Sequence, residues 1–330
     1  MNRFPLTATS LPLALALLAL PGPVRAADAP AGLESALRSI GAESGGALGV
    51  KLVHLESGRA AGLEAASRFP MASVYKLPVA VVVLAKVDAG ELSLAQEVEV
   101  RPGEHRRTAS RVDPWTPGKT VPIGALLDDM MTASGNTACD VLIRVVGGPR
   151  AVDGWLGAHG FPGIDVSWTE MMMGASFAGV AEKVKDGACD HACLDALVAK
   201  EPKAGRDAAE RAFESDPRNT ATPDDLARLL VALRKGELLS ATSTGTLLSA
   251  MRRNATGDRR IRALLPKGTP VWDKTGTIGR AANDVGLVEL PGGKGTLVVV
   301  ALVKGSEKPY GERERAIARV AKAAYDAFAR

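Results

Sequence analysis

The chain has 330 residues and a formal net charge of +4, with 46% hydrophobic, 24% charged and 4% aromatic residues. A chain of this length can bury the core of one large domain or of two lobes. No basic block alternates with aromatic side chains, so the composition gives no support for a nucleic-acid partner.

The first 26 residues have the pattern of a secretory signal. Arg3 precedes an apolar run at residues 11–20, which is shorter than the roughly 20 residues a helix needs to cross a bilayer. Proline and glycine break the run at 21–23, and residues 24–26 form a small-x-small cleavage site. We expect residues 1–26 to be removed on export to the periplasm, with an uncleaved anchor helix as the alternative. No later apolar run approaches 18 residues, so we expect no stable membrane insertion.

After the signal, strand patterns occur at both ends of the sequence and helical patterns lie between them. Apolar spacing predicts helices at residues 33–40, 121–131, 224–239 and 317–328, and alternation predicts a strand at 47–55. The segments 270–273, 285–290 and 296–303 are also strand-like. We therefore expect an α/β lobe from residues 27–66 and 255–330, with one sheet flanked by terminal helices. Residues 67–254 would form an all-α lobe. A cleft between two such lobes is a natural site.

Ser73 and Lys76 stand three residues apart at the start of the apolar run 77–84. Positions i and i+3 share one face of a helix, so the lysine amine can reach the serine hydroxyl. Serine is a weak nucleophile until a base takes its proton, and a lysine kept neutral by burial can be that base. An S-x-x-K motif also arises by chance, so its interpretation depends on its partners.

Three further sites follow in chain order. Ser134-Gly135-Asn136 ends the predicted helical stretch 126–133, Glu170 lies in a methionine-rich segment, and Lys274-Thr275-Gly276 follows the predicted strand 270–273. S-x-x-K, S-x-N and K-T-G in this order are the signature of penicillin-recognising serine enzymes. With matching intervals between the motifs, nearly the whole chain after the signal resembles a class A β-lactamase. The fold implied is an antiparallel sheet flanked by terminal helices, beside a helical lobe, with the active site between them.

The resemblance implies a role for each motif residue in opening a β-lactam ring. Ser73 would attack the carbonyl and become acylated, and Lys76 would hold or accept its proton. Ser134 would pass a proton toward the ring nitrogen, with Lys274 supplying positive charge beside it. Glu170 would activate the water that cleaves the acyl-enzyme. Whether Lys76 or Glu170 is the base during acylation is disputed for the family and stays open here.

The substrate-binding residues implied by the same resemblance are Asn136, Thr275, Gly276, Thr277 and Arg260. Asn136 would hold a side-chain amide of the substrate, and the threonines and arginine would bind its carboxylate by charge-assisted hydrogen bonds. The backbone N–H groups of Ser73 and Thr277 would form the oxyanion hole. The only partner implied is a small-molecule β-lactam. We expect no cofactor, no metal and a monomeric protein.

The sequence departs from the family pattern at four positions. Gly135 replaces the aspartate usual in the second motif, and Gly174 stands where an asparagine often helps the glutamate hold its water. Trp168 and Asn219 replace an Arg–Asp salt bridge at the base of the loop that carries Glu170. Losing such a pair as a whole costs less than leaving one charge alone.

The interval between Glu170 and Pro223 is much longer than the family needs, which indicates an insertion at about residues 175–215. Segments 180–184, 189–200 and 207–213 look helical. An insertion this long is usually functional or independently structured, so we consider a surface ornament and a lid over the cleft. If it displaces Glu170, deacylation would be slow.

The sequence has three cysteines, Cys139, Cys189 and Cys193. An oxidising compartment permits a disulfide between the last two and leaves Cys139 buried and free. Their i, i+4 spacing is tight for a bridge within a regular helix. The alternative is a metal bound by residues 189–193, although no second ligand pair occurs at zinc-site spacing.

The function predicted is hydrolysis of penicillins and cephalosporins through a Ser73 acyl-enzyme, which confers antibiotic resistance. The alternatives are a D-alanyl-D-alanine peptidase, another serine esterase of the same fold, and a penicillin-binding protein that turns over slowly. Arg259 and Arg262 compete with Arg260 for the carboxylate-binding role.

Overall fold

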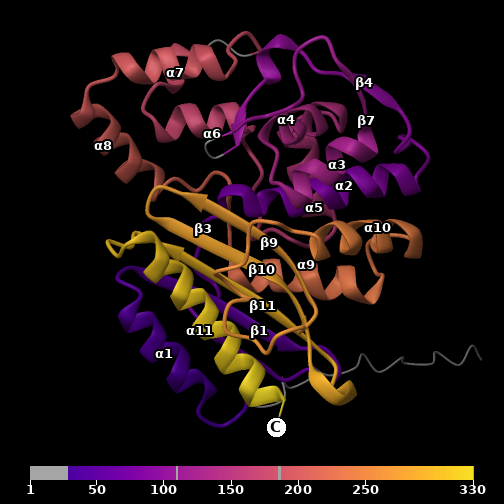
Figure 1. Ribbon diagram of the computed structural model, residues 1–330, viewed down its shortest axis with the longest axis vertical. Coiled ribbons are helices and arrows are strands. Elements are labelled where there is room, and N and C mark those ends of the chain that lie inside the picture. Colours follow the sequence, from indigo (N-terminus) through magenta and orange to yellow (C-terminus); the bar gives the residue numbers. More distant parts are fainter. Residues whose placement is uncertain (1–28, 109–110, 185–186, 330) are drawn as a thin grey trace, which may run out of the picture.

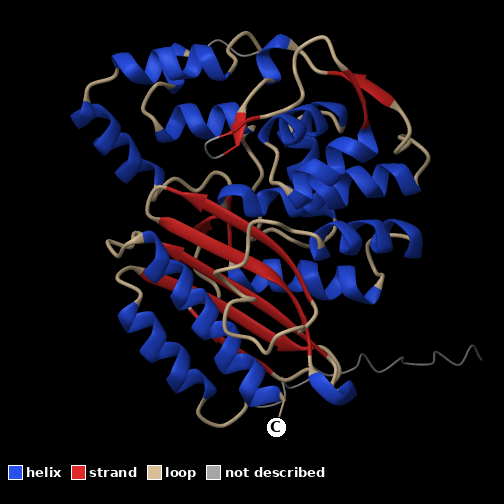
Figure 2. Ribbon diagram, in the orientation of Figure 1, coloured by secondary structure: helices blue, strands red, loops and turns tan. Residues whose placement is uncertain are grey.

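The computed structural model describes residues 29–108, 111–184 and 187–329, so the predicted signal peptide lies outside the described residues. The chain forms a five-stranded antiparallel sheet with the order β2-β1-β11-β10-β9. Its strands are β1 (Ala47–His54), β2 (Ala60–Leu63), β9 (Val271–Ile278), β10 (Ala281–Glu289) and β11 (Thr296–Lys304). The predicted sheet made from both ends of the sequence is confirmed (Figures 1 and 2).

The central strand β11 is buried on both faces, because successive side chains of a strand point to opposite sides of the sheet. Val298, Val300 and Leu302 belong to the core shared with the helical half of the molecule. The core under the terminal helices contains the alternate residues Leu297, Val299, Ala301 and Val303. The sheet therefore separates two apolar cores.

Helices cover both faces of the sheet. The terminal helices α1 (Leu33–Glu43) and α11 (Tyr310–Phe328) pack side by side on one face (Figure 1). Helix α9 (Pro223–Lys235) contacts β1 and β11 on the other face. The expectation of terminal helices flanking the sheet is confirmed.

Helix α2 (Lys76–Asp88) lies at the centre of the helical half. Every residue from Lys76 to Leu84 is buried, which explains why this segment has no polar face. Its surroundings include α3 (Ile123–Thr132), α4 (Asn136–Val145), α5 (Pro149–Ala158) and α10 (Ala241–Arg252). Within the described ranges, no helix is both long and apolar enough to cross a membrane.

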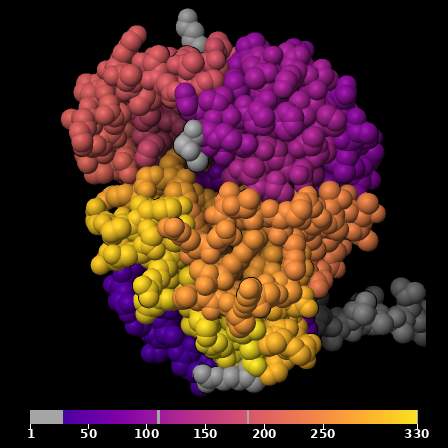
Figure 3. Space-filling view, viewed as in Figure 1, coloured from indigo at the N-terminus to yellow at the C-terminus, as the bar shows by residue number. Residues whose placement is uncertain are grey.

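The insertion folds into a short 3-10 turn, η3 (Ala181–Lys183), and two helices, α7 (His191–Lys200) and α8 (Lys203–Phe213). The predicted helix at 180–184 is wrong beyond that single turn, which glycines with left-handed backbone bracket on both sides. Asp190 caps α7 by accepting from Cys193 N, and Pro202 stands at the N-cap of α8. Helix α8 packs against α6 (Glu170–Phe177), and Figure 3 shows the insertion beside the 100–150 segment.

Two predicted boundaries are wrong for local reasons. The Lys-Thr-Gly motif lies inside β9 and not after its end, because β9 stays paired with β10 through Ile278. Helix α9 ends at Lys235 because Gly236 adopts a left-handed conformation with φ 72°. The division into lobes at residues 66/67 and 254/255 stays a prediction.

Short strand pairs connect loops outside the five-stranded sheet. They are β3 (Phe69–Pro70) with β8 (Thr220–Ala221), β4 (Glu97–Glu99) with β7 (Thr120–Pro122), and β5 (Arg107–Thr108) with β6 (Arg111–Val112). The β3–β8 pair ties the chain just before Ser73 to the chain just after the insertion.

Candidate active site

Ser73 lies in the 3-10 turn η1 (Ala72–Tyr75), which continues directly into α2. The turn places Lys76 Nζ 3.2 Å from Ser73 Oγ. Lys76 is fully buried, and its ammonium also donates to Ser134 O at 2.7 Å and to Asn136 Oδ1 at 2.5 Å. One buried cation therefore joins the first two motifs.

Left-handed backbone at residues other than glycine occurs around this turn. Ala72, directly before the nucleophile, has φ 46°, Ser134 has φ 60° and Asn219 has φ 50°. Such conformations cost about 1–3 kcal/mol each and cluster at active sites. Gly276 completes the arrangement, since a Cβ there would collide with Met71 O and lie 3.0 Å from Ser73 N. Only glycine lets β9 approach the N–H of the nucleophile this closely.

The hydroxyl of Ser134 lies between two lysines. Lys274 Nζ donates to Ser134 Oγ at 3.0 Å, and Lys76 Nζ lies 3.4 Å from the same oxygen. Burial lowers the pKa of Lys274 to about 7, and the charge of Lys76 adds to that effect while nearby carboxylates oppose it. A hydroxyl held by two amines can relay a proton.

The unusual Gly135 has a steric cause. A Cβ at this position would collide with the carboxylate of Asp129, which accepts a hydrogen bond from Trp115 Nε1 at 2.9 Å. The N-terminus of α4 is instead satisfied by Asp113, whose Oδ2 accepts from Thr137 N at 2.7 Å. A side chain at residue 135 would therefore require the Asp129 carboxylate to move, while Asp113 caps the helix without it.

Glu170 is the first residue of α6, where the cap residue Thr169 accepts from Met172 N at 3.3 Å. Glu170 Oε1 lies 3.0 Å from Lys76 Nζ, and its side chain is 7% exposed. The pair is close by distance, but Oε1 satisfies no hydrogen-bond geometry within the described chain. Lys76 and Glu170 therefore form a buried ion pair beside Ser73.

The base of the loop carrying Glu170 is clamped without a salt bridge. Asn219 Oδ1 accepts from Ser167 N and from Trp168 N, both at 2.8 Å. The indole of Trp168 is covered by the Arg218 guanidinium, 4.2 Å from its ring centroid, and stacks on Phe213 of the insertion. Asparagine tolerates the left-handed backbone needed here, so Asn219 and Trp168 replace the lost ion pair as a unit.

The buried pair Arg106–Asp140 is a second support that the sequence interpretation missed. Asp140 Oδ1 accepts from Glu170 N at 2.6 Å, and Oδ2 accepts from Arg106 Nε at 2.8 Å. Burial raises the pKa of Asp140 to about 6, Arg106 lowers it and Glu170 raises it further. A signal was available, because Asp140 follows Asn136 by four residues on one face of α4.

Arg260 lies beneath the end of β9. It is 2% exposed, and its guanidinium donates to Gly276 O at 3.0 Å and to Thr277 Oγ1 at 2.5 Å. It also pairs with Glu314 at 3.3 Å. The competing Arg262 is committed to Asp273 instead. Arg260 therefore supports the motif strand while it lines the cleft.

A cavity of about 690 Å³ joins these groups. Its walls include the motif residues Ser73, Ser134, Asn136, Glu170, Thr275, Gly276 and Thr277, together with Arg260. The insertion contributes His191, Leu194 and Asp195. The size suits a drug-sized molecule. The insertion is thus part of the wall of the cleft, which the sequence left open.

The cysteines form a disulfide and not a metal site. Cys189 and Cys193 are bridged with a Cα–Cα distance of 5.3 Å, and Cys139 is free and buried. The bridge spans the start of α7, where Cys189 lies before the first helical turn, so the spacing is no obstacle. Over the described ranges, no group of three or more His, Cys, Asp or Glu residues could hold a metal ion.

Comparisons of this chain with known proteins find beta-lactamases by family model, by sequence and by structure. A model of the beta-lactamase enzyme family matches residues 32–328. The extended-spectrum beta-lactamase PER-1 of Pseudomonas aeruginosa is 32% identical over 272 residues, which cover 78% of this chain and 75% of that protein. The beta-lactamase L2 of Stenotrophomonas maltophilia is 31% identical over 334 residues, which cover 98% and 96%. The solved structure of an ancestral class A beta-lactamase is similar with a TM-score of 0.71 and 27% identity, covering 89% of this chain and 99% of that one.

Proposed function

The chain belongs to the beta-lactamase enzyme family, and from this premise we propose that it hydrolyses the β-lactam ring of penicillins and cephalosporins through an acyl-enzyme on Ser73. The observation that carries this proposal is the position of Lys76 Nζ, which lies 3.2 Å from Ser73 Oγ and 3.0 Å from Glu170 Oε1. The proposed nucleophile Ser73 and the proposed general base Glu170 thus both lie within 3.2 Å of the buried Lys76 amine.

In acylation, Ser73 Oγ attacks the lactam carbonyl and gives up its proton within the Lys76–Glu170 pair. The developing oxyanion is stabilised by the N–H groups of Ser73 and Thr277, each donor contributing roughly 3–4 kcal/mol. The close approach of Gly276 to Ser73 N supports this role. Ser134 then delivers a proton to the ring nitrogen, replenished from Lys76 or Lys274 at 3.4 and 3.0 Å.

In deacylation, Glu170 takes a proton from a water that attacks the ester carbonyl. The insertion does not displace Glu170, because the carboxylate sits on the Lys76 ammonium. This contact favours turnover over the alternative of a protein that only traps penicillin. No contact of the described residues favours the peptidase or esterase alternatives.

Substrate recognition uses the two rims of the cleft. Thr275 and Thr277 on β9 would bind the substrate carboxylate, and Arg260 orients Thr277 through its 2.5 Å hydrogen bond. On the opposite rim, Asn136 would hold the side-chain amide, with its Nδ2 already donating to Arg107 O at 2.5 Å. We further propose that the protein works as a monomer in the periplasm, which its predicted signal peptide supports.

Incubation with a chromogenic cephalosporin tests the proposal. Colour development tracks ring opening, and intact mass reports the covalent adduct. Many turnovers per molecule support a β-lactamase. A single burst with a persistent adduct supports a penicillin-binding protein. The absence of both turnover and adduct would contradict a role for Ser73 in β-lactam chemistry.

A further inference from the structure

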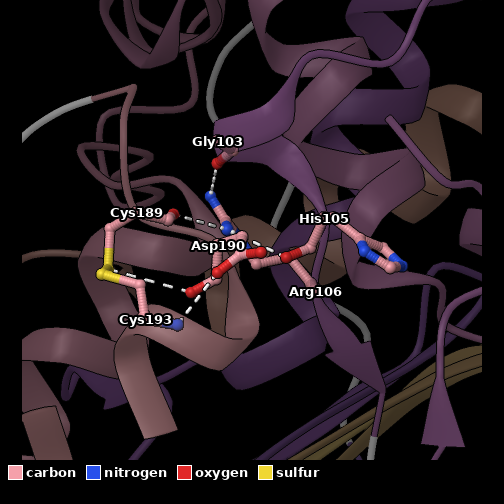
Figure 4. The surroundings of a disulfide bond; sticks show 6 residues. All are labelled: Gly103, His105, Arg106, Cys189, Asp190 and Cys193. Atoms are coloured by element: carbon pink, nitrogen blue, oxygen red, sulfur yellow. Dashed lines mark hydrogen bonds between the residues drawn. A yellow bond between two sulfur atoms is a disulfide. The ribbon is translucent and has the colours of Figure 1, made fainter. Parts of the chain in front are cut away.

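The turn that opens α7 in the insertion docks onto the chain just before β5. Arg106 Nη1 donates to Cys189 O at 3.0 Å (Figure 4). His191 N donates to His105 O at 2.8 Å. Both contacts involve backbone groups of the turn, so they depend on its shape and not on one side chain. The contacts of His105 and Arg106 with this turn therefore depend on the backbone conformation of the turn.

Two further contacts, on either side of His105 and Arg106, join the same segment to the insertion. Gly103 packs so closely on the backbone of Gly187 that a Cβ at residue 103 would collide with it. At the other end, Arg107 Nε lies 3.0 Å from Asp195 Oδ2 of α7. Gly103, His105, Arg106 and Arg107 thus all contact the insertion, although 83 residues separate Arg106 from Cys189.

The turn itself is closed twice. The Cys189–Cys193 disulfide joins its two ends, and Asp190 Oδ1 accepts from Cys193 N at 2.9 Å inside the loop (Figure 4). A cross-link between residues four positions apart removes few conformations from the unfolded chain. Its main effect is local, because it fixes the direction of the Cys189 carbonyl toward Arg106.

Arg106 connects this turn to the catalytic glutamate. Its Nη1 bonds the Cys189 carbonyl, its Nε bonds Asp140 Oδ2, and Asp140 Oδ1 holds Glu170 N at 2.6 Å. Arg106, Asp140 and Glu170 are all buried, at 6%, 4% and 8% exposure. Because water hardly reaches these three side chains, it cannot replace a hydrogen bond that one of them loses. We therefore expect a displacement of the turn to move Arg106, then Asp140, and finally Glu170.

We propose that the disulfide-closed turn at residues 189–193 is a positioning element for Glu170, which acts through Arg106 and Asp140 and supports deacylation more than acylation. The inference rests on the proposed function. It makes the insertion part of the catalytic support, distinct from both a surface ornament and a lid. Within the described ranges, no hydrogen bond joins this turn to Ser73, Lys76 or Ser134. Lys76 is held by Ser134 O and Asn136 Oδ1 as well as by Glu170, so it stays in place to take the Ser73 proton, and acylation should depend on the turn far less than deacylation.

The test compares two variants that disturb the turn with one matched control. Gly103→Ala adds a methyl group against Gly187, and Cys189→Ser with Cys193→Ser opens the disulfide. Gly154→Ala on α5 is the control, because nothing lies within 4 Å of a Cβ there. For each full-length protein, stopped-flow gives the acylation rate with a chromogenic cephalosporin, and steady-state turnover with intact mass gives the deacylation rate.

Both turn variants are expected to deacylate about tenfold or more slowly, since small misplacements of a catalytic group can cost up to about a hundredfold. They should acylate at the parent rate and accumulate acyl-enzyme, while Gly154→Ala matches the parent. Deacylation unchanged in both, or acylation reduced by the same factor, would overturn the inference. If the double serine variant fails to fold, Gly103→Ala and the parent treated with reductant decide the matter. A parent that forms no acyl-enzyme would instead overturn the proposed function, and this inference with it.

Discussion

Lys76 Nζ lies 3.0 Å from Glu170 Oε1, and both side chains are almost completely withdrawn from solvent. The same ammonium is 3.2 Å from Ser73 Oγ. In the proposed mechanism, the proton taken from Ser73 and the proton taken from water therefore reach the same pair of groups. The two half-reactions share one buried site, and they differ in which oxygen gives up its proton.

Replacing Glu170 by glutamine should separate the half-reactions. The amide keeps the size of the side chain but is no base, so general-base assistance worth about 10²- to 10⁴-fold is lost from deacylation. We expect rapid formation of an acyl adduct on intact mass followed by turnover slower by that factor. Turnover equal to that of the parent would remove Glu170 from the proposed role.

The lowered pKa of Lys274 predicts a pH dependence. Burial brings this pKa to about 7, so the amine loses its charge as the pH rises through 7. We expect kcat/KM for a carboxylate-bearing β-lactam to fall across that range. Lys274→Arg should move the fall to higher pH, because a guanidinium stays charged. A basic limb at the same pH in both proteins would contradict this assignment.

The same shift has a consequence for stability with a definite sign. Between about pH 7 and 10.5 the unfolded chain carries a proton on Lys274 and the folded chain does not. The contribution of Lys274 to the free energy of unfolding therefore rises as the pH increases from about 7 to 10.5. Chemical denaturation of the parent and of Lys274→Met at several pH values measures it. An equal slope in both proteins would exclude Lys274 as the source.

Removing one partner of the Arg106–Asp140 pair should be strongly destabilising. Both groups are buried, and an uncompensated buried charge costs about 3–5 kcal/mol. We expect Arg106→Met and Asp140→Asn each to lower the free energy of unfolding by that order. The double variant should lose less than the sum of the two, as a double-mutant cycle measures. Simple additivity would show that the charges do not interact.

Gly135→Ala tests the steric account of the altered second motif. The added Cβ collides with the Asp129 carboxylate, and overpacking typically costs about 1–3 kcal/mol. A second change, Asp129→Ala, should recover much of that loss because it removes the obstructing group. Gly157→Ala serves as the control, since a Cβ there meets nothing within 4 Å. Thermal unfolding of the four proteins is the measurement, and an unaffected Gly135→Ala would refute the account.

The motif residues could be predicted from the sequence because each motif is local. Three-residue spacing brings Lys76 to Ser73, and short strand-like segments predict β9, β10 and β11. The sheet made from both ends of the chain followed from the same patterns. The end of β9 was misplaced because the Lys-Thr-Gly motif was assumed to follow the strand, whereas pairing with β10 extends it to Ile278.

The sequence offers a signal for Asp140, which shares one face of α4 with Asn136, but the partners of the supporting residues could not be predicted, because they join distant segments through single hydrogen bonds. Nothing local to Arg106 indicates that it contacts Asp140 and Cys189. An oxidising compartment makes the disulfide a candidate, although its spacing is tight for a regular helix, and the contacts of the disulfide-closed turn depend on how the insertion packs. Likewise, the sequence offers no reason for Gly135, whereas the structure places the Asp129 carboxylate where a Cβ of residue 135 would lie.

The central claim is that Ser73 carries the acyl group and that the acyl-enzyme is hydrolysed. The most direct measurement follows a chromogenic cephalosporin by stopped-flow and maps the adduct by mass spectrometry in the parent and in Ser73→Ala. We expect many turnovers in the parent and a transient adduct on the peptide that contains Ser73. We expect neither turnover nor adduct in the variant. Sustained hydrolysis by Ser73→Ala, or a single burst with a permanent adduct in the parent, would contradict the claim.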